Sequence, residues 1–286
     1  MNETARHCAK YHHERFTRED DDPEVQEVTT AEERLSAPIA LVTGGSRGIG
    51  AATALALAER GCDVLISYRN KAARAADVVA RIHALGRRAQ AVSADITAPG
   101  EPDRLIREVA DWGHGRLDLL VLNASGGLER ELVAADPLYP QRINRDAQVA
   151  LVEAARPIMP AGSTIVFVTS HWAHLYGRVE QLPAYEPVAS TKYAGEQALR
   201  AQQDVLSAAG IRLLVVTGDL IEGTITPKLL ERVTPGLAGA RRTANGPLPT
   251  ADDMGRAIAE AAMDPALVSG ETLVIGGTLD SIPRRS

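Results

Sequence analysis

The chain has 286 residues, of which 45% are hydrophobic and 24% charged, a composition typical of a globular protein with one large domain. No apolar run approaches the roughly 18 residues that a membrane-spanning helix needs, so we expect no membrane partner. A net charge of −6 with only 3% aromatic residues argues against a basic, base-stacking surface for nucleic acid.

The cysteine content and the N-terminus both bear on the compartment. Cys8 and Cys62 are the two cysteines, which excludes a disulfide framework and fits a reducing environment. The first residues are polar and lack the apolar core of a signal peptide. We therefore expect a cytoplasmic protein.

The first 36 residues differ in composition from the rest of the chain. They carry five basic and ten acidic side chains, four of the acids in the run 19–22, and show no sustained hydrophobic period. Adjacent histidines diverge on a helix or a strand, and no carboxylate stands at a convincing ligand spacing, so we predict no metal site from His7, His12 and His13. We expect residues 1–36 to form a polar, flexible extension and residues 37–286 to form one domain.

From residue 37 onward, short apolar runs alternate with longer stretches of helical periodicity. The apolar runs predict strands at 38–43, 63–67, 89–93, 117–122, 164–169, 211–217 and 272–275. The stretches between them predict helices at 51–60, 72–85, 102–112 and 189–208. Continuously apolar strands separated by helices are typical of a parallel sheet with both faces covered. The sequence therefore predicts an α/β fold with a single doubly wound parallel sheet.

A glycine-rich loop follows the first predicted strand and opens an alanine-rich helix. Glycines there permit positive φ and a close approach of backbone N–H groups to a pyrophosphate, which the helix N-terminus also favours. Between a strand and a helix, such a loop predicts a dinucleotide site. Its candidate residues are Gly44, Ser46, Arg47, Gly48, Ile49 and Gly50.

The end of the second strand bears on the choice of cofactor. An acidic residue about 20 positions after the glycines would bind a ribose 2′-hydroxyl and favour NADH, but the segment 67–70 has none. Arg69 and Arg47 are instead placed to bracket a 2′-phosphate, although both are also ordinary surface residues. The sequence favours NADPH over NADH.

These features, in chain order, resemble the short-chain dehydrogenase/reductase family over about residues 38–278. The spacing Gly44-x-x-x-Gly48-x-Gly50 is similar to the phosphate loop of that family. The resemblance implies a Rossmann-type fold and further cofactor contacts at Asp95, Ile96, Asn123, Ala124, Ser125, Lys192, Gly218 and Thr224.

The same resemblance implies catalytic positions. Ser170 matches the serine that orients the substrate, Lys192 the active-site lysine, and Asn144 the helical asparagine that supports a proton-relay water. Most members carry Tyr-x-x-x-Lys, but Val188 stands four residues before Lys192 and has no proton to give.

Tyr185 is the candidate replacement for that tyrosine. It lies seven residues before the lysine, and seven steps of about 100° place two residues on one helix face. A Tyr-x6-Lys pair is similar to the enoyl-thioester reductase branch of the family. Pro187 fits a first helical turn but disfavours helical angles at the preceding residue, which puts Tyr185 at or beyond the helix boundary.

Three interpretations of the site follow. The favoured one is an NADPH-dependent ketoreductase for a polycyclic, polyketide-type carbonyl, similar to atypical angucyclinone ketoreductases of antibiotic pathways. Its proton comes from Tyr185, from a water on Asn144 and Lys192, or from the substrate itself, and we favour a route without a tyrosine. The second is an enoyl (C=C) reductase that uses Tyr185. The third is a non-catalytic dinucleotide-binding module, against which the retained Ser170, Asn144 and Lys192 argue.

The segment 221–250, which follows the sixth strand and contains several prolines, predicts a lid over a small-molecule substrate. Asp219 and Glu222 are unusual beside an anionic cofactor, and we interpret them as solvent-facing or helix-capping. We expect a homo-oligomer, either a dimer or a tetramer.

Overall fold

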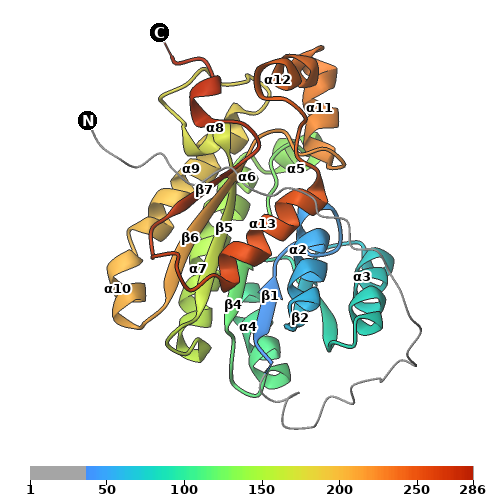
Figure 1. Ribbon diagram of the computed structural model, residues 1–286, viewed down its shortest axis with the longest axis vertical. Coiled ribbons are helices and arrows are strands. Elements are labelled where there is room, and N and C mark those ends of the chain that lie inside the picture. Colours follow the sequence, from blue (N-terminus) through green and yellow to red (C-terminus); the bar gives the residue numbers. More distant parts are fainter. Residues whose placement is uncertain (1–36, 286) are drawn as a thin grey trace, which may run out of the picture. The chain divides into compact units, whose positions relative to one another are not determined.

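The computed structural model describes residues 37–285, so the predicted extension at 1–36 lies outside the described residues. Seven parallel strands form one sheet in the order β3-β2-β1-β4-β5-β6-β7 (Figure 1). The strands are β1 (Ile39–Val42), β2 (Asp63–Tyr68), β3 (Ala89–Ser93), β4 (Leu119–Leu122), β5 (Thr164–Ser170), β6 (Arg212–Gly218) and β7 (Thr272–Ile275). The predicted fold class is confirmed.

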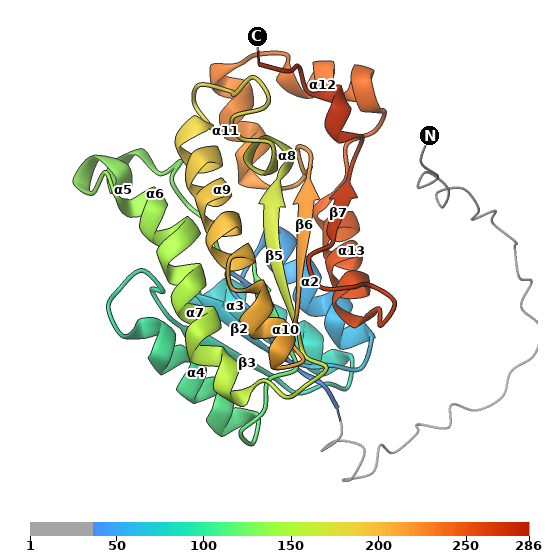
Figure 2. The same cartoon turned by 90° about the vertical axis from the view of Figure 1, so that its left-hand side faces the viewer.

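Helices cover both faces of this sheet (Figure 2). One face carries α2 (Gly48–Glu59), α3 (Ala72–Ala84) and α13 (Ala251–Met263). The other carries α4 (Glu101–Trp112), α7 (Ala147–Ala155), α9 (Glu186–Arg200) and α10 (Gln203–Ala208). No helix in the described part of the chain is both long and apolar enough to cross a bilayer.

Successive strand residues alternate between the two cores. In β4, Leu120 and Leu122 pack with α4 and α7, whereas Leu119 and Val121 pack with α2 and α13. Because both sets are buried, the strand is apolar at every position, as a central parallel strand must be. This is the physical reason that its sequence shows no alternation.

Two predicted segments differ in detail from the structure. The helix predicted at 189–208 begins at Glu186, with Pro187 in its first turn, and is divided into α9 and α10. Leu199 and Leu206 nevertheless pack in one core on both sides of the break. The predicted lid is largely helical, with α11 (Ile225–Val233) and α12 (Leu237–Asn245), because the prolines and glycines delimit helices there.

The sheet order reverses between β1 and β4, which are neighbours although far apart in sequence. Loops that leave these two strands diverge to opposite faces, and ligands of such folds bind in the crevice between them. Further along the same edge, Ser170 pairs with Gly218 at the ends of β5 and β6. The short α8 (His171–His174), α11 and α12 lie beyond that end of the sheet (Figure 1).

Candidate active site

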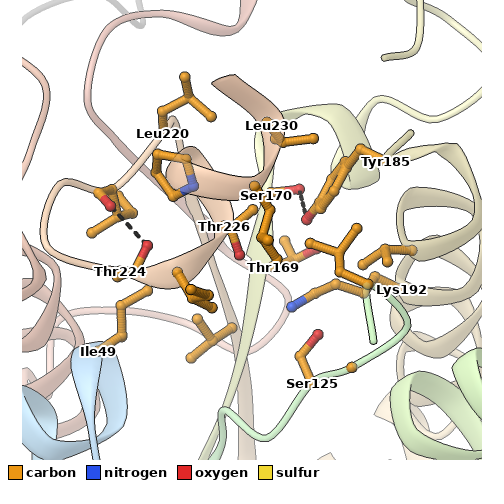
Figure 3. A pocket seen from close by; sticks show the side chains of 18 of the residues that line it. Ile49, Ser125, Thr169, Ser170, Tyr185, Lys192, Leu220, Thr224, Thr226 and Leu230 are labelled. Carbon is orange, nitrogen blue, oxygen red and sulfur yellow. Dashed lines mark hydrogen bonds between the residues drawn. The ribbon is translucent and has the colours of Figure 1, made fainter. Parts of the chain in front are cut away.

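Two adjoining cavities open at the carboxyl edge of the sheet. The glycine-loop cavity, about 640 Å³, is lined by the loops after β1 to β4 and by residues 223–228. The Ser170 cavity, about 380 Å³, is lined by the end of β5, the start of α9 and residues between 219 and 230 (Figure 3). Arg47, Asn123, Ser125 and Thr224 are among the residues that line both cavities, so the two cavities are continuous.

The glycine loop is built by close backbone packing. Gly44 has φ +66°, which favours glycine. A Cβ on Gly50 would lie 2.4 Å from Gly44 O and 2.6 Å from Asn123 Nδ2. That amide also donates to Thr43 O at 2.9 Å, which ties the loop after β4 to the loop after β1. The first turn of α2 therefore packs closely against the loops after β1 and β4, and its unpaired N–H groups suit an anion.

Most of the predicted cofactor residues meet in the glycine-loop cavity. Those in its wall are Gly44, Ser46, Arg47, Gly48, Ile49, Gly50, Arg69, Asp95, Ile96, Asn123, Ala124, Ser125 and Thr224. Lys192 lines the Ser170 cavity instead. Gly218 lines neither cavity, and a Cβ there would lie 3.0 Å from Ile221 Cδ1 and 3.2 Å from Met254 Sδ; its cofactor contact stays a prediction.

The far end of the glycine-loop cavity is cationic. Arg69 Nη1 donates to Tyr139 Oη at 2.7 Å, which holds the guanidinium at the cavity wall. Lys71 and Arg74, two exposed cations at the start of α3, also line it. Neither was among the cofactor residues predicted from the sequence, although the concentration of positive charge just after β2 was a usable signal.

Ser170 and Tyr185 form a hydroxyl pair in the Ser170 cavity (Figure 3). Tyr185 Oη donates to Ser170 Oγ at 3.0 Å. Tyr185 is the N-cap residue of α9, and it lies two residues before Pro187. Pro187 thus sets the helix boundary without keeping the phenol out of the cavity. Burial raises the pKa of Tyr185, so its hydroxyl stays protonated at neutral pH.

Among the described residues, Lys192 is the only lysine that lines the Ser170 cavity. Figure 3 shows this amine directed into the cavity. The side chain is 8% exposed, and burial lowers the pKa of Lys192 to about 8. Thr169 Oγ1, in the same wall, is buried and has no hydrogen-bond partner. Both are polar groups that a bound ligand would satisfy.

Asn144 lies outside both cavities. It sits in a π-helical turn, η1 (Arg142–Asp146), where Nδ2 donates to Gly126 O at 2.9 Å and to Thr191 Oγ1 at 3.0 Å. Its Oδ1 accepts from Ser125 Oγ at 2.9 Å. The structure brings Asn144 to the support of the loop after β4, and its side chain has no donor left for a relay water.

The rest of the Ser170 cavity is mainly apolar. Val188, at the position where the family has its tyrosine, is 3% exposed and contributes only methyl groups to the wall. Aromatic and aliphatic side chains from α8 and the lid complete it, among them Trp172, Leu220, Ile225 and Leu230. Such a wall suits a flat, apolar ligand with few polar groups.

A buried ion pair anchors the lid. Arg241 Nη2, from α12, donates to Asp219 Oδ2 at 2.8 Å, and Asn245 Nδ2 donates to the same oxygen at 2.8 Å. Arg241 also donates to Ser281 O at 2.9 Å and lies 5.2 Å above the Trp172 ring. The interpretation of Asp219 as solvent-facing is therefore wrong, since it is 5% exposed. Glu222 does lie at the surface, paired with Arg242.

No group of His, Cys, Asp or Glu side chains in the described range 37–285 has the arrangement of a metal site. His7, His12 and His13 lie outside the described residues.

Comparison with known proteins identifies the family. The sequence profile of the short chain dehydrogenase family matches residues 38–233. The protein belongs to this family of oxidoreductases, as the motifs in the sequence predict.

Two curated relatives are similar to the chain. The hydroxynaphthalene reductase of Aspergillus fumigatus is 39% identical over 141 residues, covering 48% of this chain and half, 50%, of that protein. The 1-cyclohexenylcarbonyl-CoA reductase of Streptomyces collinus is 31% identical over 250 residues, covering 85% of this chain and 87% of that protein.

Solved structures give the same picture. A short chain dehydrogenase from Burkholderia cenocepacia in complex with NADP is 32% identical, with a TM-score of 0.74, and covers 86% of this chain and 99% of its own. The angucycline C-6 ketoreductase LanV with bound NADP is 27% identical, with a TM-score of 0.72, and covers 86% of this chain and 97% of its own.

Proposed function

We propose that the protein is an NADPH-dependent ketoreductase that reduces a carbonyl of a polycyclic, polyketide-type aromatic compound. The observation that carries the proposal is the position of the Ser170 hydroxyl and the Lys192 amine in a mainly apolar cavity that adjoins the glycine-loop cavity. Similarity to an angucycline ketoreductase and to a hydroxynaphthalene reductase supports a fused-ring substrate. The volume, about 380 Å³, lies in the range of small-molecule sites.

The glycine-loop cavity suits NADPH. The tight packing of Gly50 against Gly44 leaves backbone N–H groups exposed to a pyrophosphate. Arg47, Arg69, Lys71 and Arg74 supply positive charge for a 2′-phosphate. The one acid among the predicted cofactor contacts, Asp95, is held by Thr97, whose Oγ1 donates to Asp95 Oδ1 at 2.6 Å. Two structures similar to this chain contain NADP.

When bound, NADPH supplies the hydride for the carbonyl carbon. Ser170 donates a hydrogen bond to the carbonyl oxygen, where negative charge develops. Lys192 places a positive charge in the same apolar cavity, where the low dielectric strengthens its attraction for that oxygen. With a pKa of about 8, the amine is mostly protonated at neutral pH.

The reduced oxygen must then receive a proton. Val188 has none, and the side-chain donors of Asn144 are already used within the protein. We propose that the proton comes from an acidic hydroxyl of the substrate or from a water in the cavity, with Lys192 stabilising the anion until transfer is complete.

Reduction of a conjugated C=C bond is the second candidate. It is favoured by the Tyr185–Lys192 spacing and by the similarity to a cyclohexenylcarbonyl-CoA reductase. In that reaction the Ser170–Tyr185 pair would stabilise an enolate oxygen. A non-catalytic dinucleotide module is the third, and it gives no role to the polar groups in the Ser170 cavity.

One assay separates the candidates. NADPH oxidation is followed with a hydroxylated polycyclic ketone, with an enoyl thioester, and without a second substrate. The proposal predicts turnover with the ketone and at most background rates in the other two arms. Turnover with the thioester alone supports C=C reduction, and tight NADPH binding without turnover in any arm supports the binding module.

We also propose a two-part chain and a homo-oligomeric assembly. Residues 1–36 would be an N-terminal extension that is dispensable for folding of the domain at 37–286, and its deletion should leave NADPH affinity unchanged. Sedimentation equilibrium distinguishes a dimer or tetramer from a monomer.

A further inference from the structure

The hydroxyl of Ser170 has a nearly complete set of hydrogen bonds. A serine hydroxyl offers one donor and two acceptor sites. Tyr185 Oη donates to Ser170 Oγ at 3.0 Å, and the backbone N–H of Ala173 donates to it at 3.3 Å. Both acceptor sites are therefore occupied from within the protein.

The two donors are themselves fixed. Ala173 lies in α8, for which Ser170 is the N-cap, and the bond closes that helical turn. Tyr185 is 6% exposed and is the N-cap residue of α9. The partners of Ser170 therefore come from the beginnings of two different helices, which meet over the end of β5.

The remaining hydrogen-bond site of Ser170 is its own proton. No acceptor for it is present among the described residues, and Ser170 lines the cavity. Because both lone pairs of Ser170 Oγ accept hydrogen bonds from the protein, the hydroxyl proton points into the cavity. A hydroxyl that would otherwise rotate is held as a donor, which removes the cost of orienting it during the reaction.

We propose that Tyr185 is a positioning residue that acts through Ser170, making this hydroxyl a one-directional donor toward the substrate oxygen. The inference rests on the proposed reduction. Tyr185 stands three residues before Val188, which occupies the usual position of the tyrosine. Tyr185 keeps its own proton through the cycle.

Two observations favour positioning over proton donation. The hydroxyl proton of Tyr185 is already donated in a hydrogen bond to Ser170. No hydrogen bond joins Tyr185 to Lys192 in the described part of the chain, so the lysine does not lower the pKa of the phenol through such a bond; burial instead raises that pKa. A group held in this way is better suited to orient its neighbour than to transfer a proton.

A double-mutant cycle tests the proposal. Tyr185→Phe, Ser170→Ala and the double variant are compared with the wild type for kcat and KM of the ketone and for NADPH affinity. Tyr185→Phe should lower kcat about tenfold, the size of one lost orienting hydrogen bond, with KM nearly unchanged. Ser170→Ala should lower kcat about 100-fold, as loss of an oxyanion donor does. The double variant should match Ser170→Ala, because Tyr185 acts only through Ser170.

Two outcomes overturn the proposal. One is abolished turnover in Tyr185→Phe, which would make Tyr185 the proton donor. The other is a double variant another tenfold slower than Ser170→Ala, which would give Tyr185 a separate role. Tyr193→Phe is the matched control, since Tyr193 stacks near Tyr176, outside the cavity wall, and should retain wild-type kcat.

Thermal unfolding of the same four proteins gives a readout that does not depend on turnover. Removal of the Tyr185 hydroxyl should lower Tm in the wild type but not in the Ser170→Ala background, since the lost contact is the same one. Equal shifts in the two backgrounds would show that the pair does not exist in solution. Absence of ketone reduction by the wild type would contradict the proposed function, while this thermal cycle would still decide on the contact.

Discussion

The two cavities are built in different ways. The glycine-loop cavity is lined by the glycine loop, whose packing requires glycine at Gly50, and by the loops after β2 to β4, with most of its wall between residues 44 and 143. The Ser170 cavity is lined by side chains of β5, α8, α9 and the lid, together with residues of the glycine loop and of the loop after β4. Its lid is held by contacts such as that of Arg241 with Asp219 and Ser281.

This difference separates two kinds of specificity. A backbone cradle depends on glycine at a few positions and therefore leaves a readable motif in the sequence. A side-chain cavity depends on which distant segments meet, and many sequences satisfy the same contacts. The cofactor class is thus readable from local sequence, whereas the substrate is set by long-range packing.

The largest effect is expected when the packing of the glycine loop is disrupted. Gly50→Ala places a Cβ 2.4 Å from Gly44 O, so the glycine loop must move away from α2. NADPH affinity, measured by fluorescence titration, should fall at least about 100-fold, since several N–H contacts to a charged group are lost together. Gly239→Ala is the control, because a Cβ there meets nothing within 4 Å. An NADPH affinity of Gly50→Ala equal to that of the wild type would show that the close packing of Gly50 is not needed for cofactor binding.

The next largest effect is expected when the buried Arg241–Asp219 ion pair that anchors the lid is removed. Arg241→Met leaves the carboxylate of Asp219 buried without its ionic partner, which costs about 3–5 kcal/mol. Tm and ketone affinity should fall while NADPH affinity is largely kept. Arg242→Met is the matched control, since the neighbouring Arg242–Glu222 pair is exposed and worth about 0–1 kcal/mol. Equal effects of the two variants would show that burial of the pair does not matter.

Sequence reasoning succeeded where the signal was local. The parallel sheet covered on both faces follows from apolar runs such as that of β4, and the glycine loop from residues 43–50. It failed where partners are distant: Arg241 lies 22 residues from Asp219, and nothing local marks either as buried. The relay water on Asn144 stays a prediction, and the sequence does not show that its amide donates to Gly126 and Thr191.

Cofactor choice gives a smaller effect. Arg69→Asp replaces a cation of the glycine-loop cavity with a like charge for the 2′-phosphate. NADPH affinity should fall on the order of 10- to 100-fold, and NADH affinity much less, because a charged hydrogen bond is worth about 1.5–3 kcal/mol. Titration of both cofactors checks this against Arg107→Asp, an exposed site on α4 outside both cavities. An unchanged NADPH-to-NADH ratio would remove Arg69 from the phosphate site.

The smallest effect concerns pH. Burial lowers the pKa of Lys192 from 10.5 to about 8, so the charged form prevails below that pH and is lost as the pH rises through it. NADPH affinity should therefore weaken several-fold above pH 8, because the anionic cofactor loses a nearby positive charge. Lys192→Met should bind more weakly at all pH values, without this transition. A transition that persists in Lys192→Met would assign it to another group.

The central claim, hydride delivery to a carbonyl carbon in the Ser170 cavity, is tested most directly by following the transferred atom. NADPH carrying deuterium at both C4 positions is incubated with the wild-type protein and a hydroxylated polycyclic ketone, and the product is examined by mass spectrometry and NMR. We predict one deuterium on the new carbinol carbon, with its yield strongly reduced in Ser170→Ala. Deuterium on a saturated ring carbon beside an intact carbonyl, or no incorporation at all, would contradict the account.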